Sequence, residues 1–216
     1  MTRPVVSVEG MTGLVTDVVF DFCGVLLDWR PRLTLEGQYP SGVIDMVMDP
    51  GDPWGFDHYD ALLDSGWSEE RVLEDYGRHH GPAVAWVLRV YLERQDRAFA
   101  GMIPGMEALL EDCRARGLRL WGLTNFTTRA VSAARGMFPA LGRLGDVLIS
   151  SEEGILKPDP RIYRRALDRW DLDPTSTAFV DDRFENVETA RRLGMTGIRF
   201  EGEPSLRRRL LGSPVV

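Results

Sequence analysis

Three acidic residues stand where apolar, β-rich runs of the chain end. Asp21 follows the run Val18–Phe20, and the neighbours Asp181 and Asp182 follow a second run. In open α/β sheets this edge is where ligands bind. Three carboxylates cannot crowd together as bare anions, so protons or a cation must join them. Because the set holds hard oxygen ligands, with no His or Cys at metal-ligand spacing, it favours Mg²⁺ over Zn²⁺.

Three further polar residues could complete a phosphate receptor around these carboxylates. Thr124 and Asn125 end another apolar run, and Lys157 lies in a Lys-Pro-Asp-Pro turn. A lysine would offset the charge on phosphate and on Asp21, while the Thr124 hydroxyl and the backbone N–H groups of 22–24 would bind phosphoryl oxygens. A central carboxylate can attack phosphorus and form an aspartyl-phosphate. The alternative is that Thr124 and Asn125 merely cap the next helix.

The elements that must position these residues alternate along the second half of the chain. Strands are expected at 118–123, 146–150, 177–180 and 196–200, and helices at 106–116, 127–137, 161–170 and 185–193. Strands alternating with helices of this length indicate right-handed βαβ units and a parallel sheet. The expected fold is therefore α/β, with a Rossmann-like, doubly wound core.

Between the first strand and this alternating half, the chain is helical and irregular. Ser68 is a candidate N-cap followed by two glutamates, and Pro82 opens another helix. We expect residues 30–100 to form a small all-α cap inserted after the first strand, and residues 14–29 and 101–216 to form the core domain. Two interpretations of the cap's polar aromatic residues stay open, packing or lining a substrate pocket; they include His58, Tyr59, His79 and His80.

Four stretches, taken in order, resemble the motifs of the haloacid dehalogenase-like (HAD) hydrolase superfamily. They are VVFDFCGVL, LWGLTN, the lysine of ILKPDP, and AFVDDRFENVETARRLGM. The chain is similar to the branch with an α-helical cap (subfamily I), which includes phosphatases of sugar phosphates of the α-D-glucose 1-phosphate type. The ordered set spans residues 16–200 and is specific, whereas any single motif is not.

The resemblance implies a Mg²⁺-dependent hydrolase of a small phosphate ester. It makes Asp21 the nucleophile and Lys157 the organiser of the site's charges. It makes Thr124 and Asn125, together with Lys157, the phosphate-binding residues. The implied metal ligands are the side chains of Asp21, Asp181 and Asp182 and the backbone carbonyl of Cys23.

Cys23 departs from the usual pattern, because phosphatases of this superfamily usually carry a second aspartate at that position. General acid–base catalysis is typically worth ~10²–10⁴-fold. A thiol is a weak hydrogen-bond donor and, with a reference pKa of about 8.5, a poor base while protonated. Cys23 is therefore either a substitute catalytic group or silent filler. Two alternatives follow, a 2-haloacid dehalogenase that needs no metal and a phosphate-binding protein with little turnover.

Composition narrows the functional classes. The net charge of -7 argues against nucleic acid as a partner, because phosphate backbones need basic stripes. Two cysteines, Cys23 and Cys113, make no disulfide framework, which favours a reduced compartment. No apolar run reaches the roughly 18 residues that span a bilayer, and residues 1–13 lack the apolar core of a signal peptide. We expect a cytoplasmic enzyme.

Overall fold

A parallel five-stranded sheet forms the centre of the molecule in the computed structural model, which describes residues 6–7 and 14–212. The strand order is β7-β6-β3-β8-β9, so the first strand of the sheet in sequence is its middle strand. The bounds are β3 Asp17–Phe20, β6 Arg119–Thr124, β7 Val147–Ile149, β8 Thr177–Asp181 and β9 Thr196–Arg199. All four residues of β3 are buried, as expected for a strand covered on both faces.

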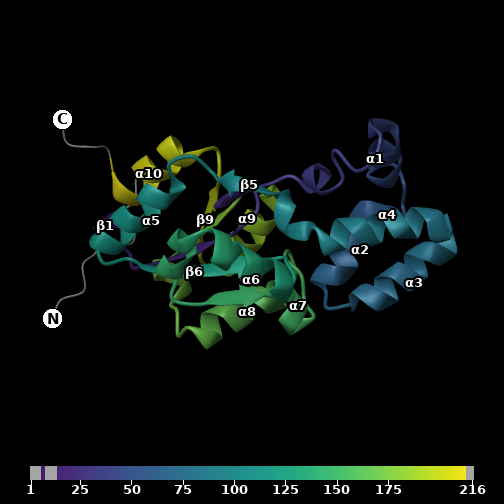
Figure 1. Cartoon of the computed structure of the whole chain (residues 1–216). Coiled ribbons are helices and arrows are strands. Elements are labelled where there is room, and N and C mark those ends of the chain that lie inside the picture. Colours follow the sequence, from purple (N-terminus) through teal and green to yellow (C-terminus); the bar gives the residue numbers. More distant parts are fainter. Residues whose placement is uncertain (1–5, 8–13, 213–216) are drawn as a thin grey trace.

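Helices cover both faces of this sheet, which gives three layers (Figure 1). One face carries α5 (Met106–Ala115), α6 (Thr128–Met137) and α10 (Glu203–Leu211), whose apolar residues join one buried cluster. The other face carries α8 (Pro160–Arg169) and α9 (Phe184–Arg192), which contribute to a second cluster. The predicted doubly wound α/β fold is therefore confirmed.

A helical segment extends from one side of the sheet, on the right in Figure 1. It comprises α1 (Ser41–Val47), α2 (Phe56–Asp64), α3 (Glu69–His80) and α4 (Pro82–Glu93). These helices enclose an apolar cluster of their own. The predicted N-cap of α3 is present, because the Ser68 hydroxyl accepts a hydrogen bond from Arg71 N.

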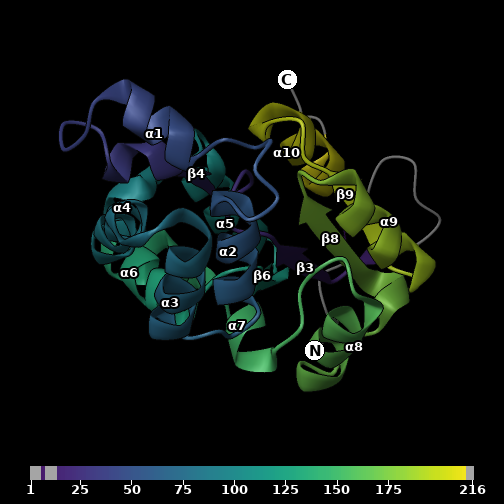
Figure 2. The same ribbon diagram turned by 90° about the vertical axis from the view of Figure 1, so that its right-hand side faces the viewer.

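Two short strands carry the chain into and out of this helical segment. They are β4 (Leu27–Trp29) and β5 (Phe99–Met102), which pair antiparallel. The sequence interpretation missed both, and the range proposed for the cap, 30–100, runs two residues into β5. Figure 2 shows the helical segment beside the carboxyl ends of the sheet strands. We propose that it acts as a cap on the core.

Three short elements and four 3-10 helices make up the other regular structure of the described residues; the 3-10 helices are Pro31–Thr34, Gln95–Ala98, Pro139–Arg143 and Pro174–Ser176. A pair of two-residue strands, β1 (Val6–Ser7) and β2 (Leu14–Val15), lies near α10, and α7 (Ser150–Glu153) follows β7 directly. The rest of the N-terminal stretch, 1–5 and 8–13, lies outside the described residues. The stretch after Glu201 forms α10, whose leucines are buried and which packs against α5. No helix in the described ranges has the length and apolar character needed to cross a bilayer.

Candidate active site

The predicted strand ends meet at the carboxyl edge of the sheet. Strand β3 lies between β6 and β8, so the three strands end side by side. Asp21 directly follows β3, and its N–H continues the pairing by donating to Val180 O at 2.9 Å. Thr124 is the last residue of β6 and Asp181 the last of β8. Parallel pairing alone therefore brings residues more than a hundred positions apart into one cluster.

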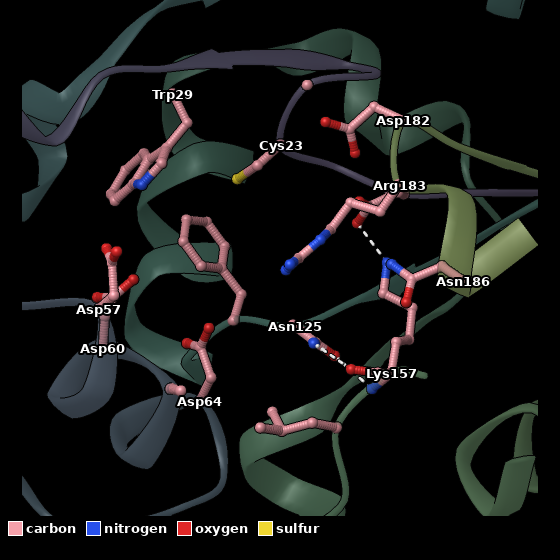
Figure 3. Close-up of a pocket in the computed structure, with 15 residues that line it drawn as sticks. Cys23, Trp29, Asp57, Asp60, Asp64, Asn125, Lys157, Asp182, Arg183 and Asn186 are labelled. Carbon is pink, nitrogen blue, oxygen red and sulfur yellow. Dashed lines mark hydrogen bonds and ion pairs between the residues drawn. The ribbon is translucent and has the colours of Figure 1, made fainter. Parts of the chain in front are cut away.

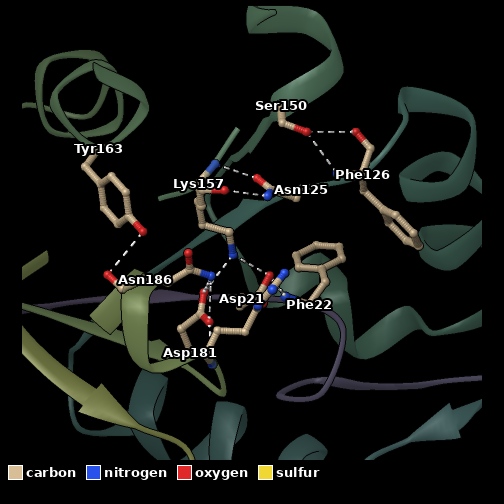
Figure 4. A network of polar contacts seen from close by, with 10 residues as sticks. Asp21, Phe22, Asn125, Phe126, Ser150, Lys157, Tyr163, Asp181 and Asn186 are labelled. Carbon is tan, nitrogen blue, oxygen red and sulfur yellow. Dashed lines mark hydrogen bonds and ion pairs between the residues drawn. The ribbon is translucent and has the colours of Figure 1, made fainter. Parts of the chain in front are cut away.

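Lys157 joins two of the carboxylates from a loop before α8 (Figure 4). Its Nζ lies 2.7 Å from Asp21 Oδ1 and 2.8 Å from Asp181 Oδ2, and its side chain is 1% exposed. Burial lowers the pKa of Lys157, but the charges of Asp21 and Asp181 outweigh burial, so the net shift is upward. The ammonium group therefore stays charged and ties the two strand ends together.

Lys157 is also the only lysine of the chain, against 25 arginines. An ammonium group is compact and can sit between two carboxylates, whereas a planar guanidinium cannot take its place without rearrangement. This count is a sequence signal for the residue that the motif-based interpretation did not use.

Asp181 is held more firmly than any other carboxylate of the cluster. Asn186 Nδ2 donates to both of its oxygens, at 2.9 and 3.0 Å, and Arg183 N donates to Oδ1 at 2.9 Å. With Lys157, these contacts fix a fully buried side chain at the start of α9. Asn186, in the first turn of α9, is thus part of this network.

Asn125 positions Lys157 by a reciprocal pair of hydrogen bonds. Its Nδ2 donates to Lys157 O at 2.9 Å, and Lys157 N donates to its Oδ1 at 2.8 Å. The alternative that Thr124 and Asn125 cap α6 is wrong, because the Thr127 hydroxyl accepts from Ala130 N and caps that helix. Binding of phosphate by Asn125 stays a prediction.

Thr124 supplies a hydroxyl that is buried without a partner. The residue is 1% exposed, and its Oγ1 has no hydrogen-bond partner in the described part of the chain. A buried polar atom left unpaired costs roughly 1–3 kcal/mol of stability. An oxygen of a bound phosphate would accept this hydrogen bond, which is the task predicted for Thr124.

Asp182 brings the third carboxylate to the cluster. One oxygen each of Asp21, Asp181 and Asp182 lies within 4.8 Å of the others, a spacing that fits one divalent cation. Burial, with the charge of Asp181, raises the pKa of Asp182, so the crowded anions are unfavourable as they stand. Gly24 makes room for Asp182: a Cβ there would lie 2.6 Å from Asp182 Oδ2, and φ is +78°. These donors and this spacing fit Mg²⁺.

The turn after Asp21 gives fewer free amide groups than the sequence interpretation expected. Phe22 N donates to Asp21 Oδ1 at 2.7 Å, and Gly24 N donates to Leu27 O at 2.9 Å. Of the three amides, that of Cys23 has no partner among the described residues.

The Cys23 side chain is half-buried and lines the cavity in front of Asp21. Burial, reinforced by the charge of Asp21, raises the pKa of the thiol well above its ordinary value, so it stays protonated.

A cavity of about 700 Å³ opens in front of these residues, and α2 forms its far wall (Figure 3). The wall carries Asp57, Asp60 and Asp64, none of which sequence reasoning identified. The interpretation that His58, Tyr59, His79 and His80 line a substrate pocket is wrong, because none of them lines this cavity. Tyr59 instead donates to Asp75, and His58 and His79 pack against Trp54.

The α2 wall is fixed to the core at its C-terminal end. Ser150 Oγ, at the start of α7, donates to Asp64 O at 2.7 Å. At Gly66 a Cβ would lie 2.8 Å from Ser151 O, and φ is +96°, so this close approach needs glycine. Burial raises the pKa of Asp60 to about 6 and, together with the charges of Asp60 and Asp21, that of Asp64 to about 8.

These shifts predict that the metal-free protein loses stability as pH rises. A carboxyl group whose pKa is raised on folding binds more protons in the folded state than in the unfolded state. Its protonation therefore adds to the free energy of unfolding, fully below pH ~4, and this added stability is lost as pH rises through the pKa of the folded state. For Asp64, whose pKa is about 8 in the folded protein, this added stability is lost by about pH 8. We expect the free energy of unfolding, measured with urea, to be roughly 1–3 kcal/mol larger at pH 5 than at pH 8.5. The Asp64→Asn variant should show a flatter profile, and an unchanged profile would contradict the prediction.

Comparison with known proteins supports the resemblance noted above. The sequence model of the haloacid dehalogenase-like hydrolases matches residues 18–194. A Mycobacterium tuberculosis protein named phosphatase MT3486 is 38% identical over 99 residues, which are 45% of this chain and 46% of that protein. The phosphoserine phosphatase of Thermus thermophilus is 37% identical over 145 residues, 64% of this chain and 51% of that protein.

A third curated relative is much longer than this chain. The mouse protein acyl-CoA dehydrogenase family member 10 is 28% identical over 199 residues, which cover 85% of this chain and 18% of that protein. The chain thus spans about half of each of the two phosphatases and under a fifth of the mouse protein.

Solved structures agree on the fold. A magnesium complex of a HAD family enzyme from Bacteroides thetaiotaomicron has a TM-score of 0.67 at 15% identity and covers 87% of this chain and 94% of that one. L-2-haloacid dehalogenase from Xanthobacter autotrophicus has a TM-score of 0.63 at 18% identity, covering 93% of this chain and 85% of that one. At these sequence identities the two structures support the fold alone. With the family match over residues 18–194, the chain belongs to the haloacid dehalogenase-like hydrolases.

Proposed function

We propose that this hydrolase is a cytoplasmic, Mg²⁺-dependent phosphatase of a small phosphorylated metabolite, working through an aspartyl-phosphate on Asp21. The observation that carries the proposal is the cluster itself. A buried nucleophile candidate, two further carboxylates within 4.8 Å and a buried ammonium group stand at one strand edge. The names of two relatives as phosphatases and the magnesium complex of a structural neighbour support the same conclusion.

Mg²⁺ would be held by Asp21, Asp181, Asp182 and the Cys23 carbonyl, and it would offset the charge of the phosphate and of these carboxylates. The protein's own groups would orient Asp21 and bind the phosphoryl oxygens. Lys157 and Phe22 N both contact Oδ1 of Asp21, which orients the carboxylate. Its Oδ2 has no hydrogen-bond partner within the described residues, so Oδ2 is the oxygen we assign to attack on phosphorus. The attack would break the bond between phosphorus and the ester oxygen and release the alcohol, and water would then hydrolyse the aspartyl-phosphate to inorganic phosphate and free Asp21. Thr124 Oγ1 and the Cys23 amide would bind the phosphoryl oxygens.

The test is hydrolysis of a panel of phosphate esters by the purified protein with Mg²⁺, measured as released phosphate. The panel includes p-nitrophenyl phosphate, an ester with an activated leaving group. We expect turnover that stops with EDTA and returns when Mg²⁺ is added. Failure to hydrolyse any member of the panel, with Mg²⁺ in excess and the protein folded, would refute the proposal.

Cys23 offers a gain-of-function prediction. The residue lines the cavity beside Asp21, and its protonated thiol is a poor base for releasing the phosphate from Asp21. Replacement by aspartate should raise kcat for alkyl phosphates, which need leaving-group protonation, by about 10²-fold. The effect on p-nitrophenyl phosphate should be smaller at the phosphorylation step. A Cys23→Ser variant serves as the size-matched control, and equal rates for Cys23→Asp and Cys23→Ser would show that this position does not limit turnover.

The half-buried cysteine favours one alternative reaction. A 2-haloacid dehalogenase uses the same aspartate to displace halide, with no acid at the position of Cys23, and one structural neighbour is such an enzyme. The alternative leaves the carboxylates of Asp181 and Asp182 without a cation. Halide release from 2-chloropropionate in the presence of EDTA would favour it over the phosphatase.

A further inference from the structure

The α2 wall places an acidic face opposite the proposed nucleophile. Asp57, Asp60 and Asp64 follow one another at spacings of three and four residues, so they lie on one face of the helix. All three line the cavity (Figure 3). Like charges at this spacing destabilise a helix. The arrangement therefore works against folding, as is common for residues retained for function.

The basic residues of the cavity do not neutralise this wall. Five aspartates line the cavity, against Lys157 and Arg183 as the basic residues. Lys157 is already shared by Asp21 and Asp181. The Arg183 side chain is 66% exposed and pairs with Glu185 at 2.9 Å. Asp60 accepts one hydrogen bond, from Tyr91 at 3.2 Å, and the Asp64 carboxylate has no hydrogen-bond partner in the described ranges.

Aromatic rings stand beside the acidic wall. Trp29 and Phe126 both line the cavity, with their ring centroids 4.9 Å apart in an edge-to-face arrangement. Figure 3 shows Trp29 on the side of the cavity that faces Asp57 and Asp60. Carboxylates next to an aromatic face are the surroundings that ammonium and quaternary ammonium groups prefer.

The opposite end of the cavity is formed by the strand-edge cluster, of which Asp21, Lys157 and Asp182 are lining residues. Thr124, the last residue of the neighbouring strand β6, does not itself line the cavity, and its buried Oγ1 has no hydrogen-bond partner among the described residues. A ligand that satisfies both ends would carry an oxyanion at the strand edge and a positive charge at α2. The two ends lie in one cavity, so a single small molecule can reach both.

We propose that the substrate is a phosphate ester whose alcohol part carries a positive charge, an amine or a quaternary ammonium group, bound by Asp60 and Asp64 beside Trp29. This inference rests on the proposed phosphatase function and deepens it. Asp60 and Asp64 are then specificity-determining residues. Asp57, one turn closer to the start of α2, adds to the local negative charge without a required contact.

The experiment compares esters that differ in charge but hardly in shape. Phosphocholine is paired with 3,3-dimethylbutyl phosphate, and O-phosphoethanolamine with 2-hydroxyethyl phosphate. With Mg²⁺ at pH 8.5, above the pKa of about 8 of Asp64, kcat/KM should be at least about tenfold higher for the cationic member of at least one pair. Glucose 6-phosphate represents the neutral sugar phosphates, and p-nitrophenyl phosphate reports whether the phosphatase works at all.

Variants of the wall test its part in this preference. In Asp64→Asn and in Asp60→Asn the ratio of kcat/KM within a pair should fall toward one, whatever happens to the absolute rate. Asp168→Asn is the matched control, because Asp168 is exposed on α8, away from the cavity. Its ratio should match that of the unaltered protein. Two independent single variants keep the test informative if one of them folds poorly.

The outcomes separate this inference from the proposed function. Hydrolysis of p-nitrophenyl phosphate with equal rates within both pairs, or with glucose 6-phosphate preferred, would overturn the inference and leave the phosphatase in place. A preference for cationic esters that survives in both Asp60→Asn and Asp64→Asn would also overturn it. If no ester is hydrolysed, the proposed phosphatase function is refuted, and so is the inference about its substrate.

Discussion

Replacement of Asp21 by asparagine should lower kcat for every phosphate ester by about 10⁴-fold or more, since loss of the proposed covalent nucleophile would leave only binding and electrostatic effects. The carboxamide has nearly the same shape as the carboxylate. Its oxygen can still accept from Phe22 N and Lys157, the contacts that orient Asp21. It has no anionic oxygen with which to attack phosphorus, so the phosphoenzyme cannot form.

The measurement is released phosphate over time, with mass spectrometry of acid-quenched protein to detect a phosphorylated form. The unaltered protein should show an acid-stable gain of one phosphoryl group during turnover, and Asp21→Asn should show none. Asp168→Asn is again the control for a charge change elsewhere. Residual activity of Asp21→Asn within tenfold of the unaltered protein would mean that Asp21 does not attack phosphorus.

Replacement of Lys157 by methionine should strongly affect both stability and activity. It leaves Asp21 and Asp181 without the cation that lies within 2.8 Å of both. Breaking a buried pair by removing one partner costs roughly 3–5 kcal/mol. The freed carboxylates would take up protons in the folded state, so the loss should be smallest near pH 5 and grow as pH rises. Hydrolysis should fall by about 10²–10³-fold, because the charge beside the phosphate is gone.

Urea unfolding without metal at pH 5 and pH 8, repeated with Mg²⁺, checks this prediction. Mg²⁺ should restore part of the lost stability, since the proposed metal site uses the same carboxylates. Arg119→Met is the matched control: Arg119 pairs with the buried Asp17 at 2.6 Å, at the opposite end of β3. This variant should lose stability yet keep its activity per folded molecule. Equal stability losses at pH 5 and pH 8 for Lys157→Met would contradict the account of the site.

The core and the central site could be predicted because both follow from local patterns. Apolar runs that end in Asp21, Thr124 and Asp181 identify strands and their carboxyl ends, and parallel pairing then forces these ends together. The sequence order of the motifs adds Lys157. For Asn125 the prediction was incomplete. Its position near Lys157 was predicted, but its two hydrogen bonds to the Lys157 backbone were not.

The acidic wall could not be predicted, although the spacing of Asp57, Asp60 and Asp64 is visible in the sequence. Spacing shows that the three share a face of α2. The direction of that face depends on how the helical segment docks, which Ser150 and the glycine at 66 fix through backbone contacts. Nothing local encodes those contacts. The short strands β4 and β5 were not predicted for a related reason: they pair with each other across some 70 residues of sequence.

The one lysine of this chain is buried in the proposed active site, so it can report chemically on the state of that site. Amine-reactive reagents have only Lys157 Nζ and the α-amino group to modify. In the folded protein the lysine is shielded and its ammonium form is stabilised, so it should react slowly. Its acylation rate therefore measures how often the strand edge opens, and slower acylation on adding Mg²⁺ and a substrate analogue would report occupancy without any assay of turnover.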